Sequence, residues 1–243
     1  MTYFIIADVH GFYSAMIKAL KQAGFDKRNK NHTLVVLGDL FDRGFQPIEC
    51  LDYVMSIPKK RRILIRGNHE DLLEDCIKRR YFFEQDIQNR TQSTVYLMGN
   101  DCLRRYPELP DIQNLGTFDR CERHTLLQKY LSECADYAEI GDDIFVHSWI
   151  PTENFSDGNW RSGDWKMARW VNPFEQWNAG LVPEGKTIYC GHWHTSWANH
   201  YYHNKGEQFG IFADFSPFVD KGIVGLDACT AYTFRVNVYK IEK

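Results

Sequence analysis

Short apolar runs that end in polar residues recur along the first third of the chain, at 3–7, 33–37 and 62–65. Each run has the length and composition of a buried strand. Residues 12–23 place apolar side chains at helical spacing, and a second helix is predicted at about 47–56, with Pro47 in its first turn. Strands that alternate with polar loops and helices predict a parallel βαβ architecture with ligand groups at the carboxyl ends of the strands.

The pattern changes after this segment. Residues 71–139 are charged, aromatic and mostly helical in spacing, which favours a helical insertion over or beside the sheet. Further strands are expected at 143–146, 186–190, 222–227 and 232–241. We see no internal repeat, low-complexity tract or linker, so residues 1–243 are interpreted as one domain.

Side chains that commonly bind metal ions directly follow five of the predicted strands. They are Asp8, His10, Asp39, Asn68, His147, His192 and His194. Because the carboxyl ends of parallel strands share one edge of a sheet, these seven side chains are expected to converge. Each motif alone could be an ordinary turn, since Gly and Asp favour turns. Five independent turns would not all place ligand-type residues at the same position, so the sequence predicts a metal centre.

The chemistry of these side chains limits the choice of metal. Carboxylate and imidazole groups together suit Mn, Fe, Zn or Ni, and they argue against a calcium site. No cysteine belongs to the predicted ligands.

Composition excludes several classes of protein. The net charge of −3 gives no global attraction to nucleic acid or to anionic membranes. The 7 cysteines are odd in number and form no Cys-x-x-Cys pair, which argues against a disulfide framework and indicates a reducing compartment. The first apolar run is too short for an export signal, and no run approaches the ~20 residues of a membrane span. We therefore expect a cytoplasmic protein.

Three motifs resemble the signature of calcineurin-like metallophosphoesterases. They are Asp8-x-His10-Gly11, Gly38-Asp39-x-x-Asp42-Arg43-Gly44 and Gly67-Asn68-His69-Glu70. The Asp-Arg-Gly and Arg-Gly-Asn-His-Glu forms resemble the phosphoprotein phosphatase branch, which includes bacterial and phage Ser/Thr phosphatases and symmetrical diadenosine tetraphosphatases. The resemblance implies an αββα sandwich, in which two mixed sheets are flanked by helices.

Two motifs depart from that branch. The chain has His147-Ser148-Trp149 where the branch usually has His-Gly-Gly or His-Ala-Gly, and Gly191-His192-Trp193-His194 where it usually has Gly-His-Thr. The second form resembles the wider superfamily, including diesterases and nucleases, in which the extra histidine binds the first metal.

The resemblance also implies roles for the predicted ligands. Two divalent cations, with manganese as the first expectation, would share Asp39. The first would take Asp8, His10, Asp39 and His194, and the second would take Asp39, Asn68, His147 and His192. Two such cations acidify a bridging water, and the resulting hydroxide would attack phosphorus in line.

His69 resembles the family's general acid, with Asp42 holding its imidazole. It follows a ligand by one residue, so it is expected to point away from the metals; the alternative is a histidine that only supports the ligands. Arg43 and Arg66 flank ligands and would clamp phosphate oxygens, unless they form surface ion pairs. Arg169 is the candidate for a third phosphate-binding arginine, with Arg161 as its competitor.

All 7 tryptophans lie between Trp149 and Trp197. This segment separates two ligand motifs and should border the site. The tryptophans could form an aromatic wall that stacks a substrate ring, or they could form the packed core of a long loop.

These observations favour a dinuclear metal-dependent phosphomonoesterase similar to protein Ser/Thr phosphatases. The expected substrate is a phosphorylated small molecule, a nucleotide or a phosphoprotein. A dinucleoside polyphosphate hydrolase and a phosphodiesterase remain alternatives, and a binding module without activity is a third. The acidic net charge makes nucleic acid an unexpected partner.

Overall fold

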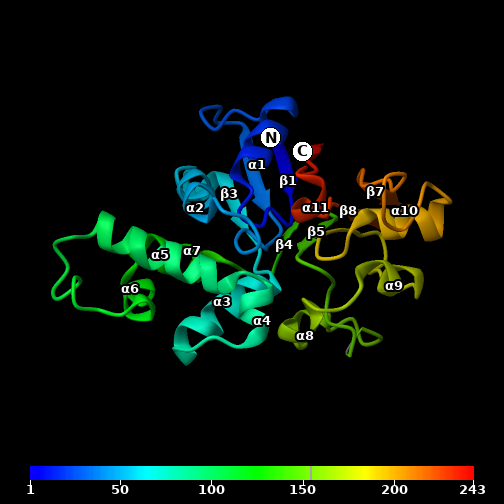
Figure 1. The fold of residues 1–243 in the computed structure, drawn as a ribbon. Helices are drawn as coiled ribbons and strands as arrows, with labels where there is room; N and C mark the ends of the chain where they lie inside the picture. The colour runs from blue at the N-terminus through cyan, green and yellow to red at the C-terminus, as the bar shows by residue number, and fades with distance from the viewer. Residues whose placement is uncertain (154) are drawn as a thin grey trace.

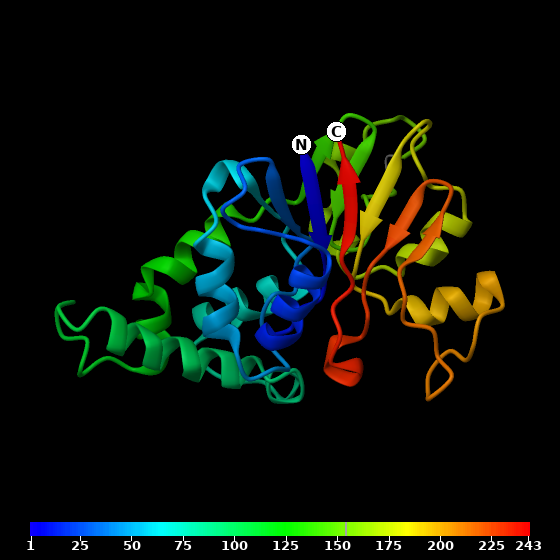
Figure 2. The same cartoon turned by 90° about the horizontal axis from the view of Figure 1, so that it is seen from above.

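Two β-sheets lie face to face in the computed structural model, which describes residues 1–153 and 155–243 (Figures 1 and 2). The first sheet has the order β3-β2-β1-β9. Its strands are β1 (Thr2–Ile6), β2 (His32–Val36), β3 (Arg62–Leu64) and β9 (Tyr239–Glu242). The first three are parallel, and β9 runs antiparallel to β1. Figure 2 shows that this pairing brings the two chain termini together.

The second sheet has the order β4-β5-β6-β8-β7. Its strands are β4 (Tyr137–Ile140), β5 (Asp143–Val146), β6 (Thr187–Cys190), β8 (Ile223–Gly225) and β7 (Phe218–Asp220). The three central strands are parallel, and both edge strands are antiparallel to their neighbours. The predicted class of two mixed sheets flanked by helices is confirmed.

Alternate residues of the central strands face different cores, which explains why these strands read as continuous apolar runs. Ile5, Val35, Phe145, Tyr189 and Val224 meet between the two sheets. The intervening residues of the first sheet, such as Phe4 and Val36, pack under the helices of the N-terminal half. Those of the second sheet, such as Ile144 and Ile188, pack under the tryptophan-rich segment and the C-terminal helices.

Seven helices belong to the N-terminal part of the chain. They are α1 (Tyr13–Gln22), α2 (Pro47–Met55), α3 (Asn68–Arg79), α4 (Glu84–Gln88), α5 (Thr91–Arg105), α6 (Thr117–Arg123) and α7 (Thr125–Glu133). The predicted insertion at 71–139 thus holds most of α3 and all of α4 to α7, and Figure 1 shows α5 and α6 extending to one side. α3 begins inside the third motif, and β4 begins at Tyr137.

Further helices follow β5 in the chain. They are α8 (Trp165–Ala168), α9 (Pro173–Asn178), α10 (Thr195–His203) and α11 (Thr230–Thr233), and single 3₁₀ turns occur at Lys59–Arg61 and Trp160–Ser162. The strand predicted at 232–241 is wrong at 232–238, where the end of α11 and a loop precede β9. None of the helices in the described part of the chain has the length and apolar character needed to cross a membrane.

Candidate active site

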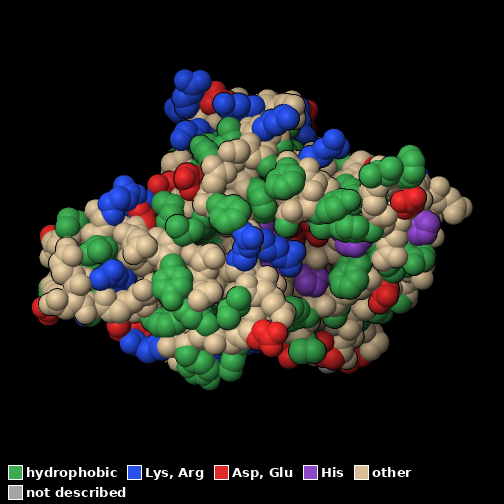
Figure 3. Space-filling view, viewed as in Figure 1, with side chains coloured by type: hydrophobic (Ala, Val, Ile, Leu, Met, Phe, Trp, Pro, Cys, Tyr) green, Lys and Arg blue, Asp and Glu red, His purple; other side chains and the backbone are tan. Residues whose placement is uncertain are grey.

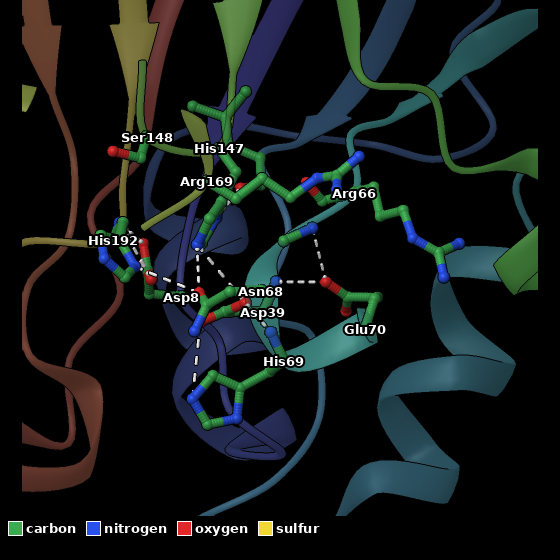
Figure 4. Close-up of polar contacts among 12 residues, drawn as sticks. Asp8, Asp39, Arg66, Asn68, His69, Glu70, His147, Ser148, Arg169 and His192 are labelled. Atoms are coloured by element: carbon green, nitrogen blue, oxygen red, sulfur yellow. Dashed lines mark hydrogen bonds and ion pairs between the residues drawn. The ribbon is translucent and has the colours of Figure 1, made fainter. Parts of the chain in front are cut away.

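Most of the polar residues that follow the strands meet at one end of both sheets. They surround a cleft of about 180 Å³. The cleft is lined by His10, Asp39, Arg43, Asn68, His69, Gln85, Asn89, Trp170, His192 and Asp227. Figure 4 shows ligand-type side chains from both sheets gathered at this point. The geometric convergence expected from parallel strands is therefore present.

Asp39 lies at the centre of this cluster. Its carboxylate oxygens are 3.7 Å from Nε2 of His10 and 3.5 Å from Nε2 of His147. Ligand atoms close enough to share a cation form two groups, and Asp39 belongs to both. One group adds His10 and His69, and the other adds His147 and His192. A carboxylate between two such groups is placed to bridge two cations.

Backbone carbonyls orient two of the histidines. Nδ1 of His147 lies 2.7 Å from the carbonyl oxygen of Leu37, and Nδ1 of His10 lies 3.0 Å from that of Phe41. A proton on each Nδ1 leaves Nε2 with a free lone pair, which is how proteins prepare histidine for a metal. Nε2 of His147 then lies 2.8 Å from Oδ1 of Asn68, so the lone pairs of two acceptor atoms face each other. A cation satisfies both atoms, so these residues fit a metal.

Crowded carboxylates add a second indication of a cation site. Burial, followed by the charges of Asp227 and Asp39, raises the pKa of Asp8 well above its ordinary value. Burial likewise raises the pKa of Asp227 to about 6. Burial alone would also raise the pKa of Asp39, but the surrounding histidines, with His147 first, lower it below its ordinary value. A bound cation would relieve the repulsion among these groups.

Asp227 was not predicted as a site residue. Asp227 was expected to be the last residue of the strand at 222–227, whereas β8 ends at Gly225 and Asp227 lines the cleft. It follows its strand by the same two residues as Asp8 follows β1. The signal in the sequence that could have found it is an acidic residue directly after the mostly apolar run 223–226.

The ligand loops have unusual backbone conformations. Asp8, His10, Asp39 and His192 have φ between 51° and 68°, in the left-handed region that side chains with a Cβ seldom adopt. Such residues persist only where the surroundings enforce them, and they concentrate at functional sites.

Two glycines permit a close approach to the ligands. A Cβ on Gly67 would lie 2.2 Å from Oδ1 of Asp39, and one on Gly191 would lie 2.1 Å from Oδ2 of Asp8. Any larger residue at either position would displace a ligand carboxylate.

Glu70 holds two of the loops together. Its buried carboxylate accepts the backbone N–H groups of Asp39, Leu40 and Gly67 at 2.8–3.0 Å, and the hydroxyl of Tyr130 at 3.0 Å. Burial and the charge of Asp39 raise the pKa of Glu70. The sequence showed Glu70 only as part of a motif, and this bracing role appears once the loops are in place.

His69 faces the cleft, which corrects the expectation that it points away. Nε2 of His69 lies 3.9 Å from Oδ2 of Asp39, and Nδ1 lies 2.8 Å from Oδ2 of Asp42. Asp42 is fully buried and also accepts hydroxyl hydrogen bonds from Thr91 and Thr94 at 2.6 and 2.7 Å. Burial lowers the pKa of His69, but the charge of Asp39 and the bond to Asp42 outweigh it, so the net pKa is raised.

The predicted phosphate-binding arginines lie in different surroundings. Arg43 lines the cleft, with Nη2 3.3 Å from Nε2 of His69. Arg66 instead donates to Asp71 at 2.6 Å and to Glu74, and Figure 4 shows its guanidinium directed away from the ligands.

Neither candidate for the third arginine reaches the cluster. Arg169 donates to the backbone oxygen of Arg66 at 3.2 Å, to Asp71 at 2.8 Å and to Asp136. Arg161 forms a two-bond pair with Glu139 at 2.7 and 2.8 Å.

His194 is not brought to the cluster either. Its Nδ1 pairs with the hydroxyl of Ser196 at 2.8 Å, and its ring lies 5.6 Å from that of Phe209. Burial lowers the pKa of His194, and no charge of the cluster contributes to that shift. Burial also lowers the pKa of His10 and of His192, but there the charge of Asp39 opposes it. The geometry gives the proposed ligand role of His194 no support.

Most of the tryptophans form a core. Trp149 and Trp160 are buried, and Trp165, Trp177, Trp193 and Trp197 pack partly buried against the same cluster. Trp170 is 41% exposed and lines the cleft, with its ring 6.1 Å from that of His192. The packing interpretation therefore holds for six tryptophans, and one remains available to a substrate.

The fold and the cluster define a class: two-sheet α/β proteins with candidate metal ligands at the strand ends. A family model described as calcineurin-like phosphoesterase matches residues 1–205, and the chain belongs to this family.

Several curated relatives match parts of the chain. A serine/threonine-protein phosphatase 1 of Salmonella typhimurium is 30% identical over 120 residues, which are 49% of this chain and 48% of that protein. A symmetrical bis(5'-nucleosyl)-tetraphosphatase of Klebsiella pneumoniae is 41% identical over 70 residues, or 29% of this chain and 24% of that protein. The chain thus spans half or less of the length of these relatives.

Among solved structures, a cold-active protein-tyrosine phosphatase of a Shewanella species has a TM-score of 0.61 at 16% identity, over 100% of this chain and 75% of that one. At this identity the likeness concerns the fold alone.

Proposed function

We propose that the protein is a metal-dependent phosphoric ester hydrolase that acts on phosphomonoesters, in the manner of protein Ser/Thr phosphatases. The observation that carries the proposal is the position of Asp39, shared by two groups of histidine ligands, directly beside the His69–Asp42 pair and Arg43. The match to a serine/threonine-protein phosphatase over 49% of the chain supports the same choice.

Asp8, His10 and Asp39 would hold one cation, and Asp39, Asn68, His147 and His192 would hold the other. Asp227 adds negative charge beside them. When bound, two divalent cations polarise a phosphoryl group and lower the pKa of water. The mixed oxygen and nitrogen donors suit manganese first, and iron, zinc or nickel as alternatives.

The chain's own side chains position the ester. Arg43 would donate two N–H groups to phosphoryl oxygens as their charge increases. His69 would donate the proton on Nε2 to the leaving oxygen. Asp42 accepts from Nδ1 at 2.8 Å, which orients the ring and favours its charged form.

The alternatives receive unequal support. The hint of a diesterase was His194, which pairs with Ser196 outside the cluster. A dinucleoside polyphosphate hydrolase is favoured by the 41% identity to a symmetrical tetraphosphatase, although over 70 residues, and by the exposed Trp170 in the cleft.

A substrate panel with metal-reconstituted protein tests the proposal. It would compare p-nitrophenyl phosphate, bis-p-nitrophenyl phosphate, diadenosine tetraphosphate and a phosphopeptide by kcat/KM. We expect both monoesters to rank above the diester and the tetraphosphate. A higher kcat/KM for the diester or the tetraphosphate would contradict the monoester assignment, and absence of turnover on every substrate would contradict the hydrolase itself.

A further inference from the structure

A second pocket adjoins the cleft on the side of Arg43. This aromatic pocket has a volume of about 380 Å³. Its lining includes Phe12, Phe45, Phe234, Arg43 and Arg90. Arg43 also lines the cleft, where Nη2 lies 3.3 Å from Nε2 of His69. The aromatic pocket and the cleft therefore share one side chain, and that side chain contacts the proposed acid.

The rings of the aromatic pocket are attached to the ligand loops. Phe12 follows Gly11 in the first motif, and Phe45 follows Gly44 at the end of the second. The two loops are joined, because the N–H of Gly44 donates to the carbonyl of His10 at 2.8 Å. The positions of both rings are thus set by the same backbone that places the ligands.

The exposed rings cost free energy unless something covers them. Phe45 is 71% exposed and Phe234 is 68% exposed. The Phe12 and Phe234 rings meet edge to face at 5.7 Å, and the Arg90 guanidinium lies 4.5 Å from the centre of the Phe45 ring. Figure 3 shows cationic side chains beside histidines near the centre of this face, with hydrophobic side chains around them. Exposed aromatic surface next to a reactive cleft is typical of a ligand site.

We propose that the aromatic pocket holds the leaving group of the substrate and selects planar aromatic groups. The inference rests on the proposed function, because the leaving oxygen must lie near Nε2 of His69. The remainder of the leaving group then extends past Arg43, towards Phe12 and Phe45. There the faces of the phenylalanine rings and the two guanidinium groups favour a flat ring by stacking and cation–π contacts. A tyrosyl ring and a nucleobase share this chemistry.

The test compares two esters whose leaving alcohols are both primary and similar in basicity. Benzyl phosphate carries a ring, and n-butyl phosphate does not. We expect Phe45→Ala and Phe234→Ala each to lower kcat/KM for benzyl phosphate by about five- to tenfold, mainly through KM, which is the size of one aromatic contact. The kcat/KM for n-butyl phosphate should change less than about twofold. Phe212→Ala is the matched control, because Phe212 is also 68% exposed and lies outside the aromatic pocket.

Equal losses for both esters, or no loss for benzyl phosphate, would overturn the inference and leave the proposed function standing. If the wild type hydrolyses neither ester, that result counts against the proposed function. The pocket is then tested by calorimetric binding of benzylphosphonate and n-butylphosphonate to the metal-loaded protein. A preference for the benzyl compound that disappears in Phe45→Ala supports the pocket, and equal affinities overturn it. Phe45→Ala is also assayed with phosphotyrosine and with AMP. The substrate whose kcat/KM falls more shows whether the pocket holds a tyrosyl ring or a nucleobase.

Discussion

The second motif loop and the loop before α3 each carry an arginine next to a metal-ligand motif, and the surroundings of the two side chains differ. Arg43 lies in the cleft and, within the described residues, forms no ion pair. Arg66 is held by Asp71 and Glu74, and the same region holds Arg169 through Asp71 and Asp136. The Arg43 guanidinium is thus available to an anion, while the other two are compensated by carboxylates. The position of a residue in a motif fixes where its Cα atom lies, but nearby charges determine the direction of a long side chain.

The largest effect is expected at the residue that both groups of ligands share. Asp39→Asn keeps the shape of the side chain but removes its charge, so the pair of cations loses its common anionic ligand. We expect turnover to fall by about three orders of magnitude or more and the bound metal to be lost. Metal content by elemental analysis and kcat/KM measured on the same sample check this. Retention of both metals with full activity would remove Asp39 from the centre of the site.

His69→Asn separates proton donation from metal binding. The metals should stay bound, and kcat on an ester with a poor leaving group should fall by roughly 10²–10⁴-fold, the usual contribution of a general acid. The loss should be smaller on p-nitrophenyl phosphate, whose leaving group needs no proton. Equal losses on the two esters would be incompatible with the acid role.

Replacement of the arginines tests the comparison directly. Arg43→Ala should lower kcat/KM by about 10²-fold, because a charge-assisted clamp on the phosphoryl group is lost, with little change in stability. Arg169→Ala should instead leave kcat/KM within about threefold and lower the free energy of unfolding by about 2–4 kcal/mol, because Asp71 loses a buried partner. Parallel kinetics and denaturant titrations distinguish the two. A large kinetic loss in Arg169→Ala at full stability would place that arginine in the reaction.

The smallest effect concerns Asp227. Its pKa is raised from 3.8 to about 6 in the folded metal-free protein, so the native state holds this proton more tightly than the unfolded state. Wild-type stability is therefore lost as pH rises from about 4 to 6, by about 2–3 kcal/mol. Asp227→Asn should avoid that loss. Metal-free unfolding curves at pH 4 and pH 7 should show the variant gaining over the wild type at pH 7, and an equal difference at both values would contradict the interpretation.

Much of the ligand arrangement could be predicted from the sequence because it depends on one rule. Apolar runs mark the strands, and parallel strands bring their carboxyl ends together, so Asp39, Asn68 and His192 converge without any knowledge of side-chain packing. Asp227 escaped because the apolar run before it extends beyond the end of β8. The edge strands β4 and β7 were not predicted, because β4 is only half-buried and β7 has three residues.

The remaining differences have non-local causes. His194 follows the same strand as His192, but Ser196 and Phe209 hold its ring elsewhere. The direction of Arg169 depends on Asp71 and Asp136, which are 98 and 33 residues away in the chain. His69 faces the cleft because Asp42, in another loop, accepts from its ring. Partners of this kind leave no periodic pattern in a sequence.

Asp39 and His147 follow strands of different sheets, β2 and β5, and this has a thermodynamic consequence. A cation bound by both side chains would link the two sheets, so it would bind only when the sheets are packed together. Metal concentration should then regulate global stability, by about 2.7 kcal/mol at a hundredfold excess over the dissociation constant. Chelation would loosen the interface before it disturbs either layer, and the side-chain NMR signals of Ile5 and Phe145, which belong to the core between the two sheets, would report it first.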